Sequence, residues 1–338
     1  MDRAHCVIIG NGPAANSAAF TLRDNDPDLR ITVIGEERDH EYRPDLLPDY
    51  IAGKATEEDL FIGKSESYKG HDIKLRLGQR VVHADFQQRE LLLEHNEVVR
   101  FTGLIIACGA KPRIPEPLAV FEDLMLTLKT PADARLWIER LARVDTILIV
   151  GGDLTSLSLT KALLHLGKRV VFMLDCGSFW PVPFSPELRE QVARKLTEHG
   201  VEVTECTKIR RISRISDHSF EVATDRRTMV VGILGAFFGL VPNVKFLAGS
   251  GLDIERGILV DEYLKTSREN VYAAGDCAQV YHPEIRDYWV SIGYTNAVEL
   301  GKAAALNLLG DMVAVNVKRE SILEVDGINV NSSWWMEF

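Results

Sequence analysis

The sequence lacks a segment long enough to cross a membrane. An uncharged stretch from Met229 to Val241 is too short to span a bilayer and contains three glycines. The apolar run that precedes Gly10 covers only Cys6 to Ile9, which is far too short for a signal peptide. The sequence therefore predicts a protein without a membrane span, located in the cytoplasm.

Cysteine is also scarce, and its spacing argues against several kinds of site. The five cysteines lie far apart and include no Cys-x-x-Cys pair, which argues against a disulfide framework, a zinc site and a redox dithiol. The nine histidines form no His-x-x-His pair, and no metal site is predicted. The cysteines are Cys6, Cys108, Cys176, Cys206 and Cys277.

Positive charge is in the minority. Lysine and arginine number 39 against 49 aspartates and glutamates, so the net charge is −10. This balance argues against a polyanion such as nucleic acid as the partner. With 338 residues, of which 46% are hydrophobic, the chain is long enough for two or three domains with a well-buried core.

What the sequence does contain is a nucleotide-binding pattern in its first forty residues. An apolar strand enters the turn Gly10–Ala15, a helix follows, and a second apolar strand ends at Glu36. Gly10 allows the tight turn, Gly12 lets the backbone approach a pyrophosphate, and Ala15 lets the helix pack closely on the strand. The helix N-terminus directs free N–H groups at the phosphates, and Glu36 can accept hydrogen bonds from an adenosine ribose. The alternative is an ordinary βαβ unit without a ligand.

A second βαβ unit is predicted at residues 146–175. It comprises an apolar strand that ends in Gly151–Gly152, a helix to about Leu166, and a strand that ends at Asp175. Before it, Lys111 to Pro117 contains three prolines, which cannot continue a strand or a helix, and this stretch is interpreted as a domain boundary. The fold class is therefore α/β with two Rossmann-like units.

Together these motifs resemble the pyridine nucleotide-disulfide oxidoreductase superfamily, in particular its rubredoxin, ferredoxin and nitrite reductase branch, which uses FAD without a redox disulfide. The resemblance runs from about residue 4 to 312. It implies a glutathione-reductase-like fold: an FAD domain (1–115 and 244–312), an inserted NAD(P)-type domain (116–243) and a truncated remnant of the C-terminal interface domain (313–338). The motifs that carry it are Gly10–Ala15, Arg43–Pro44, Tyr50–Lys54, Leu104–Ala110, Gly257–Asp261, Tyr272–Asp276 and Ala297–Gly301.

The resemblance also implies which residues contact FAD. The first turn would hold the pyrophosphate, Asp276 would accept a hydrogen bond from the ribityl chain, and Val81 or Val82 would touch the adenine through its backbone. The helix that follows Trp289 would direct its positive end at the flavin N1–O2 edge, where reduced flavin carries negative charge. The implied FAD contacts are Gly10, Gly12, Pro13, Ala14, Ala15, Glu36, Arg43, Pro44, Val81, Val82, Ala107, Cys108, Gly109, Gly275, Asp276 and Ala297.

The second nucleotide site departs from the family pattern. The family's Gly-x-Gly-x-x-Gly falls on Gly151, Asp153 and Ser156. Asp153 adds bulk and a like charge where a pyrophosphate should approach, a repulsion of roughly 1 kcal/mol per charge pair in water at ~4 Å. We expect the fold to be retained and NAD(P)H to bind weakly. The degenerate NAD(P) site comprises Gly151, Gly152, Asp153, Ser156, Asp175 and Gly239, and Pro48, Ser158 and Phe237 are further departures.

No side chain is predicted to be catalytic, because residues 43–48, which carry the redox cysteines in related branches, contain none here. The first hypothesis is an FAD-dependent oxidoreductase that passes electrons from NAD(P)H to an iron–sulfur or rubredoxin-type protein. The alternative is an FAD-bearing electron-transfer subunit of a larger complex whose NAD(P)H site has decayed. A third is a module in which FAD only stabilises the fold.

The apolar segment Trp334–Phe338 also has two interpretations. Its large side chains would be costly if left in water. They either pack on the chain's own surface or dock on a partner, which would give a homo- or hetero-oligomer.

Overall fold

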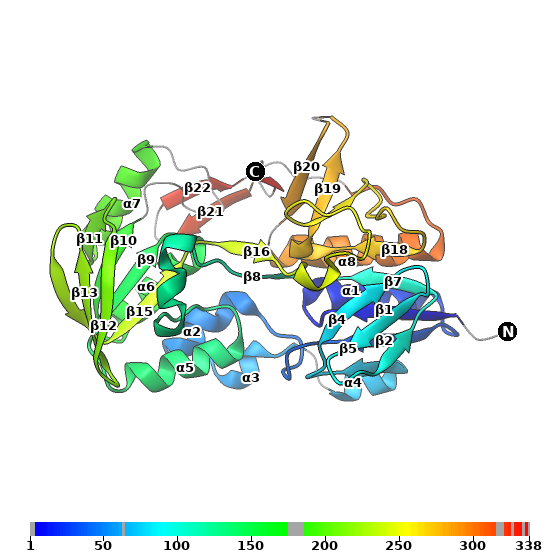
Figure 1. Cartoon of the computed structure of the whole chain (residues 1–338), viewed down its shortest axis with the longest axis horizontal. Coiled ribbons are helices and arrows are strands. Elements are labelled where there is room, and N and C mark those ends of the chain that lie inside the picture. Colours follow the sequence, from blue (N-terminus) through cyan, green and yellow to red (C-terminus); the bar gives the residue numbers. More distant parts are fainter. Residues whose placement is uncertain are drawn as a thin grey trace.

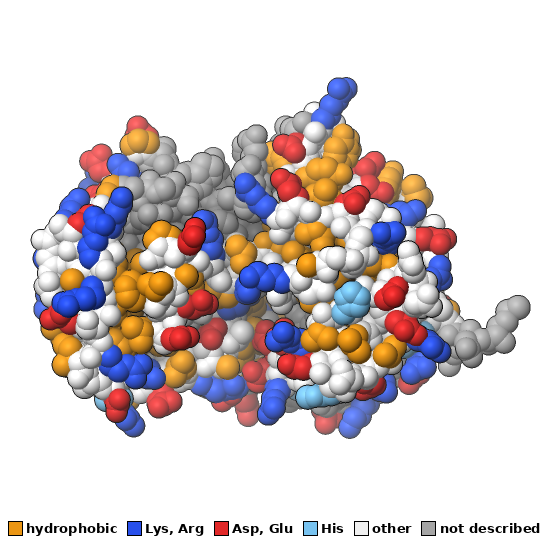
Figure 2. All heavy atoms as spheres, in the orientation of Figure 1, with side chains coloured by type: hydrophobic (Ala, Val, Ile, Leu, Met, Phe, Trp, Pro, Cys, Tyr) orange, Lys and Arg blue, Asp and Glu red, His pale blue; other side chains and the backbone are white. Residues whose placement is uncertain are grey.

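The computed structural model describes residues 4–62, 65–174, 186–284, 286–291 and 293–315, and the strand residues 321–325, 328–332 and 335–336. The chain forms two α/β lobes that lie side by side (Figure 1). None of the helices in these ranges is both long and apolar enough to cross a bilayer. On the face in Figure 2, acidic and basic side chains are interspersed over both lobes.

The first lobe is built on a five-stranded parallel sheet in the order β18-β7-β1-β2-β3. Helices α1 (Pro13–Asn25) and α8 (Tyr294–Leu309) pack against each other beside this sheet, and the Ser17 hydroxyl donates a 2.7 Å hydrogen bond to the Val298 carbonyl. The smaller sheet of β4, β5 and β6 adds apolar side chains to the same core. The strands are β1 (His5–Ile9), β2 (Arg30–Ile34), β3 (Ile73–Arg76), β4 (Val81–Asp85), β5 (Glu90–Leu93), β6 (Val98–Arg100), β7 (Gly103–Ile106) and β18 (Val271–Ala273).

The second lobe is built on a four-stranded parallel sheet in the order β11-β10-β9-β15. Ile147 and Ile149 face a core shared with α5, α6 and α7, whereas Leu148 and Val150 face a core shared with the meander β12–β14, as strand alternation requires. The elements are α5 (Pro131–Leu141), α6 (Leu154–His165), α7 (Pro186–Glu198), β9 (Thr146–Gly151), β10 (Arg169–Leu174), β11 (Glu202–Glu205), β12 (Ile209–Ser216), β13 (Ser219–Thr224), β14 (Thr228–Val231) and β15 (Ile233–Phe237).

Two connections join the lobes. Strand β8 (Ala110–Pro112) leaves the first lobe and pairs antiparallel with β16 (Leu240–Pro242), which returns to it. The prediction that Lys111–Pro117 contains no strand is wrong for its first residues, because a two-stranded ribbon is an edge that tolerates proline. The short helices η1 (Pro44–Leu46), α2 (Leu47–Ile51) and α3 (Glu57–Leu60) place Leu47, Ile51 and Leu60 in the core of the second lobe.

The last described strand pairs with another strand of the same chain. Strand β23 (Trp335–Met336) pairs with β20 (Asp287–Ser291), with Met336 opposite Val290. This pairing concerns the backbone, so whether the apolar side chains of Trp334–Phe338 pack on this chain or dock on a partner stays a prediction. Trp334, Glu337 and Phe338 lie outside the described residues. The remaining elements are α4 (Ser65–Gly70), η2 (Glu116–Leu124), η3 (Lys245–Leu247), η4 (Gly275–Cys277), β17 (Ile258–Val260), β19 (Ala278–His282), β21 (Ser321–Val325) and β22 (Ile328–Ser332).

The close packing of α1 on α8 depends on Gly301. A Cβ atom at this position would lie 2.1 Å from the Ala14 carbonyl oxygen, so the helices would have to move apart. We expect Gly301→Ala to lower the free energy of unfolding by about 1–3 kcal/mol. The control is Gly70→Ala, because a Cβ there meets nothing within 4 Å. Urea unfolding at one fixed FAD concentration compares them, and equal midpoints for the two variants would contradict the packing argument.

Candidate flavin site

A cleft of about 1080 Å³ lies between the lobes. Its walls come from the carboxyl ends of β1, β2 and β7, from η4 and the start of α8, and from the second lobe. In parallel α/β sheets this edge is where ligands bind. The predicted residues that line it are Gly10, Gly12, Pro13, Ala14, Glu36, Pro44, Val81, Ala107, Cys108, Gly109, Asp153, Gly239, Gly275, Asp276 and Ala297.

Gly10 is required by the fold itself. Its φ is +115°, and a Cβ atom would lie 2.0 Å from the carbonyl oxygen of Ala107. The Gly10 N–H donates to the Ile34 carbonyl at 2.8 Å, and the Ala107 N–H donates to the Ile9 carbonyl at 2.7 Å. The first turn and the loop after β7 therefore meet backbone to backbone at the floor of the cleft.

Gly12 has no such internal reason to be glycine. Its φ of −84° suits any residue, and a Cβ atom would meet nothing within 4 Å. It is the N-cap of α1, and no side-chain cap bonds the first N–H groups of that helix. A side chain here would project into the open cleft, where a phosphate could otherwise reach the helix N-terminus. The turn thus fits the pyrophosphate of a dinucleotide.

Asp276 in η4 faces a basic group that the motifs did not indicate. Its carboxylate Oδ2 lies 3.7 Å from the Lys129 ammonium Nζ, and both residues line the cleft. Burial raises the pKa of Asp276 above its ordinary value, and the nearby Lys129 charge works in the opposite direction. Lys129 immediately precedes Thr130, the N-cap of α5, so the second lobe contributes a charged group to the first lobe's site.

Several other predicted residues lie elsewhere. Ala15 is fully buried and Val82 does not line the cleft, whereas Val81 does. Arg43 pairs with Asp45, its Nε lying 2.9 Å from Oδ1, and its guanidinium lies over the Tyr294 ring at 5.4 Å. Thus Arg43 stands beside the first residue of α8 rather than in the cleft lining.

The cysteines differ in environment. Cys108 lines the cleft, packs against the core of the first lobe and donates a 3.3 Å hydrogen bond to the Asn243 carbonyl. Cys277 is buried and its thiol donates to the Ile106 and Ala274 carbonyls. The cysteine spacing argues against a disulfide framework, but it did not predict that Cys206 is disulfide-bonded, whereas Cys6, Cys108 and Cys277 are free thiols. The described residues contain no cluster of three or more potential metal ligands.

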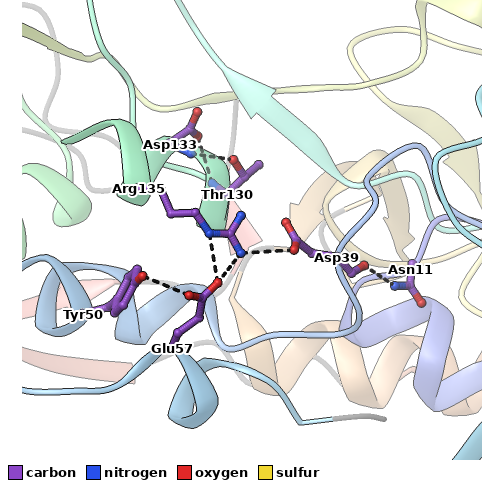
Figure 3. Close-up of polar contacts among 7 residues, drawn as sticks. All are labelled: Asn11, Asp39, Tyr50, Glu57, Thr130, Asp133 and Arg135. Carbon is purple, nitrogen blue, oxygen red and sulfur yellow. Dashed lines mark hydrogen bonds and ion pairs between the residues drawn. The ribbon is translucent and has the colours of Figure 1, made fainter. Parts of the chain in front are cut away.

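A charged network ties the second lobe to the first turn (Figure 3). The Arg135 guanidinium of α5 donates to Glu57 Oε1 from Nε at 2.9 Å and contacts Asp39 Oδ1 from Nη2 at 3.3 Å. Asn11, between the two glycines of the turn, donates to the Asp39 carbonyl at 3.1 Å. A capping box between Thr130 and Asp133 fixes the start of α5. Sequence motifs gave no signal for this network.

The second predicted site is only partly in the cleft. Asp153 and Gly239 line it, whereas Gly151, Gly152 and Ser156 do not. A Cβ atom on Gly151 would lie 2.2 Å from the Phe237 carbonyl oxygen, so this turn repeats the construction of the first. Asp175 lies outside the described residues.

Comparison with known proteins decides the family. The profile described as pyridine nucleotide-disulphide oxidoreductase matches residues 4–304. The chain belongs to this family. It is 29% identical to rhodocoxin reductase of Rhodococcus erythropolis, over 90% of this chain and 72% of that protein. It is 30% identical to the nitric oxide reductase FlRd-NAD(+) reductase of Klebsiella pneumoniae, over 81% of this chain and 72% of that protein.

Solved structures have the same fold as this chain. A putidaredoxin reductase–putidaredoxin complex matches with a TM-score of 0.87 and 22% identity, over 96% of this chain and 80% of that chain. A water-forming NADH oxidase of Lactobacillus brevis matches with a TM-score of 0.87 and 20% identity, over 96% of this chain and 73% of that chain. These matches confirm the predicted α/β fold with Rossmann-like domains. As a member of this family, the chain is an FAD-dependent oxidoreductase.

Gly12→Ala tests whether the open turn receives the cofactor of this family. The methyl group meets no protein atom, so the free energy of unfolding should change by less than about 0.5 kcal/mol. The methyl group would occupy the space that a pyrophosphate needs. The affinity for FAD should therefore fall at least ~tenfold, which corresponds to about 1.4 kcal/mol of binding free energy. Fluorescence titration with FAD measures this, with Gly70→Ala as the control. Unchanged affinity would exclude Gly12 from the site.

A double-mutant cycle tests the ion pair that joins α5 to α3. Because the Arg135 and Glu57 side chains are 40% and 48% exposed, their coupling energy should be only about 0.5–1 kcal/mol. Arg135→Ala, Glu57→Ala and the double variant, compared by urea unfolding, give this value. The coupling should shrink at 1 M salt, roughly the ionic strength at which the Debye length falls to 3 Å. Strictly additive effects at low salt would show that the pair is not coupled.

Proposed function

We propose that this chain takes electrons from a nicotinamide nucleotide and delivers them to a small redox protein through FAD held in the cleft. The observation that carries the FAD site is the open first turn, where Gly12 leaves the N-terminus of α1 uncapped within the cleft. Bound flavin accepts electrons in pairs and can release them singly, which suits an iron–sulfur or rubredoxin-type acceptor. Relatives of this chain are named as reductases of rhodocoxin, putidaredoxin and ferredoxin, which supports a redox protein as the acceptor.

The residues around the cleft then have distinct roles in this proposal. The turn at Gly10–Ala14 binds the pyrophosphate, and Glu36 hydrogen-bonds the adenosine ribose. Helix α8, whose first turn carries no acidic residue, directs its positive end toward the flavin and favours negative charge there. Asp276, with its Lys129 partner, orients the chain between ring and phosphate. No protein side chain needs to donate or accept a hydride.

A specific observation favours a second candidate, the electron-transfer subunit of a larger complex. Asp153 fills the second turn with a buried carboxylate, so a dinucleotide meets an obstacle at the site where the family would bind it. In this alternative, electrons reach the flavin from a protein partner. Cytoplasmic location and an oligomer formed through Trp334–Phe338 stay predictions.

Anaerobic titration of the FAD-loaded protein separates the two candidates. Under the main proposal, NADH or NADPH should bleach the flavin absorbance promptly, with about one equivalent per flavin because hydride transfer moves two electrons. Reduction by dithionite or by a co-purified protein, but not by either nucleotide, would instead support the second candidate. A folded protein that is colourless and refuses added FAD would contradict both.

A further inference from the structure

The two glycine turns are built alike but end differently. In each, a glycine lies against a carbonyl of a neighbouring strand loop: Gly10 against Ala107, and Gly151 against Phe237. In each, the residue two positions later is the N-cap of a helix. The N-cap of α1 is Gly12, with no side chain, whereas the N-cap of α6 is Asp153. The same place is open in one turn and holds a carboxylate in the other.

The Asp153 carboxylate is fully engaged by N–H groups from two elements. Its Oδ1 accepts the Ser156 N–H at 2.8 Å, within the first turn of α6. Its Oδ2 accepts the Gly239 N–H at 3.3 Å, from the loop that follows β15. Helix N-terminal and loop N–H groups that converge on one anion are what a phosphate uses in this kind of turn. Here the protein supplies the anion itself.

Ser156 completes the arrangement. Its hydroxyl accepts the Asp153 N–H at 3.0 Å and donates to the Asp153 carbonyl at 2.6 Å, forming a reciprocal capping box. Ser156 is 0% exposed and Asp153 is 7% exposed. The two residues that replace family glycines therefore bond each other and leave the helix N-terminus without free donors at these positions.

Burial also affects the charge of this group. Desolvation raises the pKa of Asp153 to about 6, against the opposing effect of the N–H groups that bond it. A carboxyl group with this pKa is still mostly ionised at pH 7. The turn thus carries its own negative charge under ordinary conditions.

We propose that Asp153 occupies the pyrophosphate position of the second nucleotide site and sets how weakly this chain binds nicotinamide dinucleotides. The inference rests on the proposed function, in which such a nucleotide is the electron donor. A dinucleotide must displace the carboxylate from the Ser156 and Gly239 N–H groups, or bind without contacting them. Asp153 is therefore a specificity-determining residue that disfavours pyrophosphate-bearing donors.

The test measures binding of NAD⁺ and NADP⁺ to the full FAD-loaded chain by calorimetry, because oxidised nucleotides bind without reducing the flavin. Asp153→Gly, alone and with Ser156→Gly, should bind at least ~tenfold more tightly than the unmodified chain. Asp153→Asn keeps the bulk and removes the charge, so its affinity for the nucleotides should lie between that of the unmodified chain and that of Asp153→Gly. If loss of the cap unfolds Asp153→Gly, the asparagine variant alone still tests the charge.

Asp145→Asn is the matched control. Asp145 directly precedes β9, its side chain is 97% exposed, and it pairs with Lys168 at 3.4 Å. The substitution removes one negative charge from the same βαβ unit without touching the turn, so its affinity should equal that of the unmodified chain. A gain as large as that of Asp153→Asn would mean that overall charge, and not the filled turn, limits binding.

The outcomes separate this inference from the proposed function. If the unmodified chain and all Asp153 variants bind NAD⁺ or NADP⁺ equally tightly, the inference about Asp153 is overturned. The proposal that a nicotinamide nucleotide is the electron donor is then retained. If even the Asp153→Gly/Ser156→Gly variant, folded by circular dichroism, binds neither nucleotide, the inference is also overturned. In that case the proposal that a nicotinamide nucleotide is the electron donor is overturned as well, because something other than Asp153 prevents binding at the site.

Discussion

The architecture of the cleft depends on how closely backbone turns approach at the carboxyl edge of the sheets. At Gly10 a single missing Cβ atom lets the loop after β7 lie against the first turn, with only 2.0 Å available where a side chain would begin. The resulting floor holds Ala107, Cys108 and Gly109 beside the N-terminus of α1. At Gly301 the absence of a side chain likewise lets α8 lie against α1. Glycine thus creates both the floor and one wall of the site.

A second constraint is the difference between the two turns. Duplicate βαβ units place two helix N-termini at one cleft, and each can bind an anion. In the first unit the N-terminus of α1 is uncapped, so an external phosphate can satisfy it. In the second unit Asp153 satisfies the N-terminus of α6 internally. The two lobes are held in this relation by the β8–β16 ribbon and by Arg135, whose guanidinium contacts Asp39 of the first lobe.

Much of this could be predicted from the sequence because it is local. Consecutive residues determine the apolar strands, the glycine turns and the helices that follow them. The structure has these elements at His5–Ile34 and Thr146–Leu174. Replacement of a family glycine by Asp153 was visible as well. What could not be predicted are contacts between distant residues: Asp153 with Gly239, Lys129 with Asp276, and Arg135 with Glu57. Such contacts depend on the tertiary packing of segments far apart in the sequence, which local sequence periodicity does not indicate.

The central claim is that the first turn holds FAD. Amide hydrogen exchange of the full chain, compared with and without saturating FAD, tests it most directly because it reports which N–H groups a ligand covers. The account predicts slower exchange at the N–H groups of residues 12, 14 and 15, of 107–109 and of 275–276, with little change at 153–156. Protection confined to residues 153–156, or no protection at the first turn despite FAD binding, would contradict it.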